Sequence, residues 1–132
     1  MNELIITIYS FGYKKSGIPP DEAGNGGGYV FDCRCLPNPG REERFKDKTG
    51  LDDEVIEYLD NRPGIDDFLH AAFSLIDKHA KNYSDRGFTD LMAAFGCTGG
   101  QHRSVYCAAK IAARLENAGY KTKVVHTELA ES

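Results

Sequence analysis

The fold is decided by the stretch Leu91-Met92-Ala93-Ala94-Phe95-Gly96-Cys97-Thr98-Gly99-Gly100-Gln101-His102-Arg103-Ser104, in which an apolar run gives way to a glycine-rich turn. Residues 91–95 are wholly apolar, which is typical of a central parallel strand that is buried on both faces. Residues 104–117 follow with small apolar side chains at helical spacing, and Gly119 is placed to end that helix. The order of strand, turn and helix indicates an α/β protein.

Three other segments of the chain are predicted to be strands. Residues 4–9 are rich in β-branched and apolar side chains, and residues 29–33 and 122–126 are shorter runs of the same kind. Residues 10–14 are expected to leave the first strand and enter a loop. Residues 19–28 are rich in proline and glycine and are expected to be loop throughout.

Two further helices are predicted between the second strand and the apolar run. The first extends from its N-cap Asp52 to about Asp60 and ends before Pro63. The second covers residues 65–83, and six apolar residues are expected to share one of its faces: Phe68, Leu69, Ala72, Phe73, Leu75 and Ile76. We therefore predict one α/β domain over residues 1–132, with a mostly parallel sheet of about four strands flanked by helices.

Composition limits the classes of function. A chain of 132 residues with a net charge of −4 is one domain long, and its acidic balance argues against nucleic-acid binding driven by overall charge. The N-terminus is acidic and no apolar run approaches the ~20 residues that span a bilayer, so we expect a cytoplasmic protein without a membrane partner. The four cysteines are expected to be reduced thiols, and their spacing predicts no metal site or cofactor: Cys33, Cys35, Cys97 and Cys107.

The turn after the apolar run has the features of an anion-binding loop. It lies where α/β sheets bind ligands, beyond the carboxyl end of a strand and at the start of a helix whose free amides attract negative charge. Adjacent glycines allow the backbone to approach an anion closely, and the guanidinium of Arg103 can hold a phosphate. The expected ligand-binding residues are Cys97, Thr98, Gly99, Gly100, Gln101, His102, Arg103 and Ser104.

This loop can be compared with two known kinds of phosphate-binding loop. A nucleotide-binding P-loop needs four residues between its glycines and a following lysine, and neither is present. The spacing from Cys97 to Arg103 does match the loop of cysteine phosphatases, in which a thiolate attacks phosphorus. A Cys97-dependent phosphatase that uses Arg103 is therefore the alternative to simple, non-catalytic binding.

Four linked motifs resemble the C-terminal domain of the RNase adapter protein RapZ. The motifs, in chain order, are Ser10-Phe11-Gly12-Tyr13-Lys14, Val30-Phe31-Asp32-Cys33-Arg34-Cys35-Leu36-Pro37-Asn38-Pro39, Thr49-Gly50-Leu51-Asp52 and Gly96-Cys97-Thr98-Gly99-Gly100-Gln101-His102-Arg103-Ser104-Val105. His126 and Leu129 match the closing His-x-x-Leu of that domain, so the resemblance covers nearly the whole chain. Full-length members also carry a nucleotide-binding P-loop domain, which residues 1–132 do not resemble, so the resemblance implies no ATP or GTP binding for them.

The resemblance implies a ligand and a partner. Domains of this family sense glucosamine-6-phosphate and bind small RNAs, so the chain is expected to bind a phosphosugar and to serve as an RNA-binding adapter or sensor. Arg34 and Asn38 would then line the same pocket as the loop. RNA binding would need a local basic surface, multiplied in a homo-oligomer, with these candidate residues: Lys14, Arg41, Arg44 and Lys46. Gly40, Lys46 and Thr127 depart from the family pattern, which leaves the identity of the sugar open.

Overall fold

The computed structural model describes residues 3–130 as one α/β unit. Its elements, in chain order, are β1 (Ile5–Gly12), β2 (Tyr29–Asp32), the 3-10 helices η1 (Pro39–Arg41) and η2 (Glu43–Phe45), α1 (Asp53–Asp60), α2 (Ile65–Asp85), β3 (Asp90–Cys97), α3 (Arg103–Asn117) and β4 (Lys121–His126). The predicted fold class is therefore confirmed.

The four strands form one sheet in the order β2-β3-β1-β4, and every neighbouring pair is parallel. The apolar strand β3 lies in the interior of the sheet, as its sequence predicts. Gly12 is paired with Cys97 and Asp32 is paired with Gly96. The carboxyl ends of three strands therefore meet at one edge of the sheet, which is where the predicted anion loop begins.

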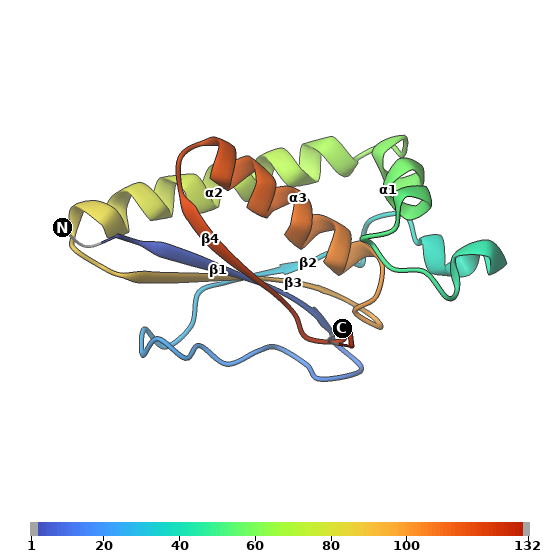
Figure 1. The fold of residues 1–132 in the computed structure, drawn as a ribbon, viewed down its shortest axis with the longest axis horizontal. Coiled ribbons are helices and arrows are strands. Elements are labelled where there is room, and N and C mark those ends of the chain that lie inside the picture. Colours follow the sequence, from blue (N-terminus) through green and yellow to red (C-terminus); the bar gives the residue numbers. More distant parts are fainter. Residues whose placement is uncertain (1–2, 131–132) are drawn as a thin grey trace.

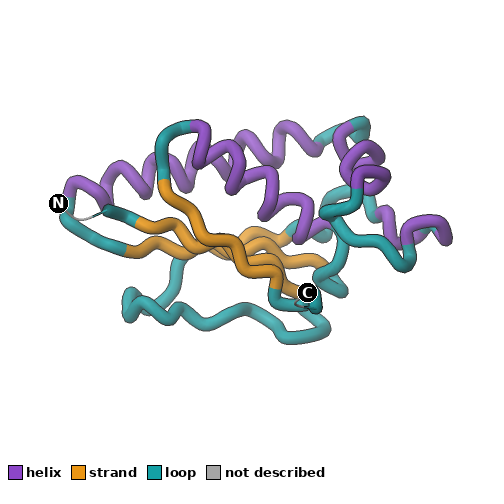
Figure 2. Tube along the Cα trace, viewed as in Figure 1, coloured by secondary structure: helices purple, strands orange, loops and turns teal. Residues whose placement is uncertain are grey.

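The helices lie on one side of the sheet. In Figure 1, α2 and α3 cover the same face, and α1 lies beyond the end at which the strands terminate. The long segment between β1 and β2 passes along the opposite face as an irregular loop (Figure 2). The result is a sheet covered by helices on one face and by a loop on the other.

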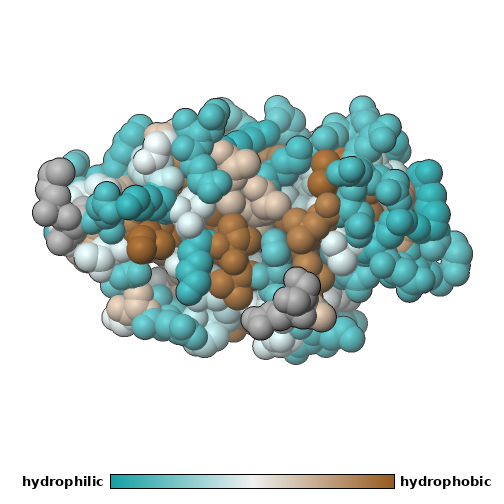
Figure 3. Space-filling model, viewed as in Figure 1, coloured by the Kyte–Doolittle hydropathy of each residue, from teal (hydrophilic) through white to brown (hydrophobic). Residues whose placement is uncertain are grey.

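The main core fills the space between the sheet and the two long helices. Ile6 and Ile8 of β1 pack there with Ile76 of α2 and Ile111 of α3, and all four are fully buried. A smaller core, built on Phe11, lies under the loop on the opposite face. The surface in Figure 3 is mostly hydrophilic with separate apolar patches, and no helix within residues 3–130 is long and apolar enough to cross a membrane.

Two predicted boundaries of strands are wrong. Residues 10–12 continue β1 rather than entering a loop, because the aromatic ring of Phe11 is buried and the strand stays paired with β3 as far as Cys97. Gly96 and Cys97 belong to that same pairing, so they end β3 instead of beginning the loop. The irregular turn is therefore shorter than predicted and covers residues 98–102.

Two details of the predicted helices also differ. Leu75 is 48% exposed, because the buried stripe of α2 passes through Leu69, Ala72 and Ile76 instead. Asp52 does precede α1, but its carboxylate accepts a hydrogen bond from the backbone amide of Thr49 rather than from a helix amide. The positions of the helices are otherwise as predicted, and all four cysteines are free thiols.

Candidate anion-binding groove

The loop between β3 and α3 is held against the end of β1 by backbone hydrogen bonds. The amide of Tyr13 donates to the carbonyl of Cys97 at 2.8 Å, and the amide of Lys14 donates to the carbonyl of Thr98 at 3.1 Å. The sheet therefore fixes the start of the loop, while Thr98 itself remains exposed to solvent.

Gly100 is the conformationally demanding position of this loop. Its φ of +73° lies in the left-handed region, and a Cβ there would come within 2.5 Å of the Gly12 amide nitrogen. Any side chain at this position would be both strained and in collision with β1. The structure thus explains why a glycine stands at position 100, whereas a Cβ at Gly99 would meet nothing within 4 Å.

The side chains of Gln101 and His102 hold the other side of the loop in place through hydrogen bonds. The side-chain amide of Gln101 donates to the carbonyls of Lys46, at 3.0 Å, and of Lys48, at 2.8 Å. Nε2 of His102 lies 2.8 Å from the carbonyl oxygen of Phe45. Because a carbonyl can only accept, Nε2 carries the proton and Nδ1 is left as the free ring nitrogen. Both side chains therefore contact the segment before α1.

Cys97 and Ser104 lie under the loop. The thiol of Cys97 is 3% exposed, belongs to the main core and donates to the hydroxyl oxygen of Ser104 at 3.2 Å. Ser104 is fully buried. The two side chains therefore join the end of β3 to the first turn of α3, and this contact faces the core rather than solvent.

Arg103 is the first residue of α3 and is 6% exposed. Its Nη1 donates to the carbonyl oxygens of Arg34, at 3.0 Å, and of Leu36, at 3.1 Å. Among the buried side-chain nitrogens and oxygens of residues 3–130, only Nε of Arg103 has no hydrogen-bond partner. A buried cation whose donors are incompletely used is costly unless a negative group lies beside it.

A groove of about 750 Å³ lies beside this guanidinium. Four of the residues predicted to bind the ligand come together in its lining, namely Arg34, Asn38, Thr98 and Arg103. Its other lining residues come from the segment after β2 and from α1 and the turn that follows it: Cys35, Leu36, Pro37, Arg41, Glu42, Tyr58 and Pro63. Sequence reasoning missed the contribution of Tyr58 and Pro63, for which no local pattern gave a signal.

The charges around the groove are partly paired. Arg34 contacts the carboxylate of Asp32, with Nη2 to Oδ2 at 2.7 Å, and lies over the ring of Tyr13. This hydrogen bond from Arg34 holds the pKa of Asp32 below its usual value. Within the described residues, Arg103 forms no ion pair of its own. The groove therefore offers an anion one buried guanidinium that is not neutralised by direct contact.

The residues that the resemblance suggests for RNA binding are divided between two environments. Arg44 pairs with Glu42, and Lys46 pairs with Glu43 at 2.8 Å. Lys14 and Arg41 are exposed, and Arg41 lies in the lining of the groove. Only part of this basic set is thus free of a carboxylate partner.

The segment after β4 completes the edge of the sheet behind the loop. The carboxylate of Glu128 accepts hydrogen bonds from the amides of Gly12, at 3.0 Å, and Ser16, at 2.9 Å. Burial raises the pKa of Glu128, but these hydrogen bonds outweigh it and leave the pKa below its usual value. Nearby, the hydroxyl of Ser10 lies 2.6 Å from Nδ1 of His126.

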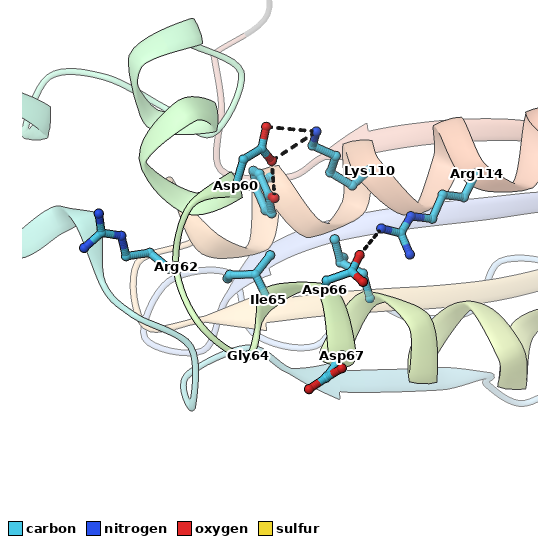
Figure 4. Close-up of a pocket in the computed structure, with 10 residues that line it drawn as sticks. Asp60, Arg62, Gly64, Ile65, Asp66, Asp67, Lys110 and Arg114 are labelled. Atoms are coloured by element: carbon cyan, nitrogen blue, oxygen red, sulfur yellow. Dashed lines mark hydrogen bonds and ion pairs between the residues drawn. The ribbon is translucent and has the colours of Figure 1, made fainter.

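A smaller pocket of about 240 Å³ lies where α1 meets α2 and α3 (Figure 4). Four of its charged groups are paired: Asp60 contacts Lys110, and Asp66 contacts Arg114 at 2.9 Å. The hydroxyl of Tyr106 also donates to Asp60. Because Lys110 and Arg114 are already paired with carboxylates, they should attract an anion less strongly than Arg103 does.

The chain is similar to known proteins along almost its whole length. The RapZ C-terminal domain family matches residues 4–130. Three relatives are each named nucleotide-binding protein and come from Solibacter usitatus, Caldicellulosiruptor bescii and Thermotoga neapolitana. They are 38%, 41% and 40% identical to this chain over 99%, 96% and 94% of its length, respectively. The chain spans only 39%, 41% and 42% of the length of these three relatives.

Proposed function

Because the chain belongs to the RapZ C-terminal domain family, we propose that it is a non-catalytic domain that binds a phosphometabolite in the groove at Arg103. The ligand class is a phosphosugar, of which glucosamine-6-phosphate is the example to test first. The phosphate would lie at the loop 98–102 and the first turn of α3. The sugar would extend toward Arg34 and Asn38, which line the same groove.

The observation that carries this proposal is the buried, incompletely satisfied guanidinium of Arg103. It is 6% exposed and lacks an ion-pair partner within residues 3–130, and its Nε has no hydrogen-bond partner there. A phosphate beside it would supply the missing negative charge and accept charge-assisted hydrogen bonds. An anion should therefore bind more tightly beside Arg103 than beside a guanidinium that is exposed to water.

The start of α3 adds to the attraction for an anion. The first amides of a helix have no acceptor within the helix, and no side chain caps them in α3. These amides carry partial positive charge, which favours a phosphate close to the helix start. The hydroxyl of Thr98, exposed at the groove, is a further donor.

The domain would act as the ligand-responsive part of an RNA-binding adapter. The relatives are more than twice as long as the matched region, so a ligand-sensing module joined to other domains fits their organisation. Lys14 and Arg41 are exposed basic residues, and Arg41 also lines the groove, which supports a role of both in RNA binding. Two cations give little affinity for RNA, so this role calls for a homo-oligomer that repeats the surface.

Isothermal titration calorimetry with inorganic phosphate, glucosamine-6-phosphate and unphosphorylated glucosamine tests the proposal. We expect both phosphate compounds to bind, glucosamine not to bind, and Arg103→Ala to weaken binding by about 30-fold or more, as loss of a charge-assisted contact implies. Arg86→Ala, which removes an exposed arginine outside the groove, is the matched control and should bind as the wild type does. If neither phosphate compound binds to the wild type, the proposal is overturned.

A further inference from the structure

A second groove, of about 480 Å³, lies between α2 and the start of β2, away from the residues that line the groove at Arg103. Its lining comes from one strand residue and one side of the helix: Tyr29, Leu75, Lys78, His79, Asn82, Tyr83 and Arg86. The helical members recur at spacings of three and four residues, so they form a continuous stripe along the C-terminal half of α2. We call this feature the α2 groove.

The floor of the α2 groove is built from aromatic rings in mutual contact. His79 lies edge-on to Tyr29, with ring centroids 5.3 Å apart, and to Tyr83 at 4.3 Å. Nδ1 of His79 is also 3.1 Å from the hydroxyl oxygen of Tyr29. Leu75 adds an aliphatic side chain that is 48% exposed. The groove therefore presents a preformed apolar surface, which is what a partner side chain needs for burial.

The charge of the α2 groove is opposite to that of the chain. The protein has a net charge of −4, yet no carboxylate lines this groove. Lys78 and Arg86 are exposed, and neither forms an ion pair with any described residue. Lys78 lies in α2 and Arg86 is its C-cap, eight positions later, which corresponds to about 12 Å along the helix axis. The aromatic floor therefore lies between two cations that have no ion-pair partner among the described residues.

We propose that the α2 groove docks a short acidic segment of a partner protein. In an extended segment, two carboxylates four residues apart are about 13 Å from one another, which matches the separation of Lys78 and Arg86. A large apolar side chain midway between them points to the same side of the segment and reaches the aromatic floor. Nucleic acid fits less well, because its affinity depends on many phosphate contacts and this groove offers two cations.

Display of random twelve-residue peptides on phage, with the wild-type chain as bait, tests this docking. We expect the selected peptides to carry two carboxylates around a large apolar residue. Their synthetic forms should bind at least 10-fold more weakly to the double variant Lys78→Glu/Arg86→Glu. The control Lys15→Glu/Lys123→Glu makes the same change of charge elsewhere and should bind like the wild type. Leu75→Ala should weaken binding by about 3-fold or more through lost apolar contact.

Four results would overturn the proposal. They are a failure to select any such peptide, equal affinity of the selected peptides for both double variants, displacement of the peptides by a single-stranded RNA oligonucleotide, and self-association of the wild type through this groove. The melting temperature of each variant shows whether it is folded, and because all four substituted cations are exposed, folding should be retained. None of these variants alters the groove at Arg103, so phosphate binding is measured independently.

Discussion

Nη1 of Arg103 donates to the carbonyl oxygen of Leu36 at 3.1 Å, and this bond joins the first turn of α3 to the segment that follows β2. The same nitrogen donates to the carbonyl of Arg34. The guanidinium that would meet an anion therefore also holds together two walls of the groove. A ligand that orders Arg103 would by this connection order the segment that carries Arg34 and Asn38.

Gly100→Ala should destabilise the fold far more than Gly99→Ala. Alanine at position 100 would need a φ of +73° and a Cβ within 2.5 Å of the Gly12 amide nitrogen, whereas a Cβ at Gly99 meets nothing within 4 Å. We expect a loss of about 2 kcal/mol or more at Gly100 and less than about 1 kcal/mol at Gly99. Urea unfolding of both variants measures the difference, and equal losses would show that the loop is not packed against β1 as described.

Gln101→Glu should cost more stability than Gln101→Ala, although glutamate has the shape of glutamine. The amide of Gln101 donates to the carbonyls of Lys46 and Lys48, and a carboxylate can only accept. Alanine loses both hydrogen bonds, each of which contributes about 1 kcal/mol to the free energy of unfolding. Glutamate loses them too and also places a negative charge beside two carbonyl oxygens. Unfolding at neutral pH ranks the variants. Equal stability of Gln101→Glu and wild type would contradict the contacts of this side chain.

His126 should make the fold sensitive to mild acid. Burial lowers the pKa of His126 below its usual 6.5, so the unfolded chain binds the proton more readily than the folded one. Its contribution to stability is therefore complete above about pH 6.5 and falls as the pH drops below that value. His126→Gln should reduce the loss of unfolding free energy between about pH 7.5 and about pH 5.5.

The matched control for His126 is the exposed His70 on α2. His70→Gln makes the same substitution at a position that has no contact with Ser10, so it shows whether the effect is specific to position 126. If His126→Gln and His70→Gln change the pH dependence equally, burial of His126 beside Ser10 is not the cause of the acid sensitivity.

Cys97→Ser should leave phosphate binding within about twofold of the wild type, because the thiol donates to the Ser104 hydroxyl in the core and a serine hydroxyl can donate there too. Neither protein should hydrolyse p-nitrophenyl phosphate faster than buffer. Turnover by the wild type that Cys97→Ser abolishes would instead support the cysteine phosphatase suggested by the spacing of Cys97 and Arg103.

Much of the fold could be predicted from sequence because its signals are local. The apolar strand, the glycine turn and the small-residue helix stand next to one another in the chain, and their order alone indicates a parallel α/β sheet. The boundary errors at residues 10–12 and 96–97 arose because burial of Phe11 and pairing with β3 are long-range effects. Taken from sequence alone, a glycine such as Gly12 indicates a loop, because its pairing with a distant strand is not visible there.

The candidate groove was less predictable than the loop beside it. Arg34 and Asn38 were placed there by family resemblance, and they do lie with Thr98 and Arg103 in one lining. The directions of Gln101 and His102, toward carbonyls some 55 residues earlier in the chain, follow from tertiary packing and have no local signal. The same is true of Tyr58, which α1 brings to the groove.

Anion binding at Arg103 is tested most directly by a titration of the isotope-labelled protein with inorganic phosphate, followed in amide correlation spectra. We predict saturable shifts concentrated at the amides of Thr98, Gly99, Gly100 and Arg103 and at the side-chain Nε–H of Arg103, all lost in Arg103→Ala. Shifts that are absent from these groups, or that fall instead at Lys110 and Arg114 in the smaller pocket, would contradict it.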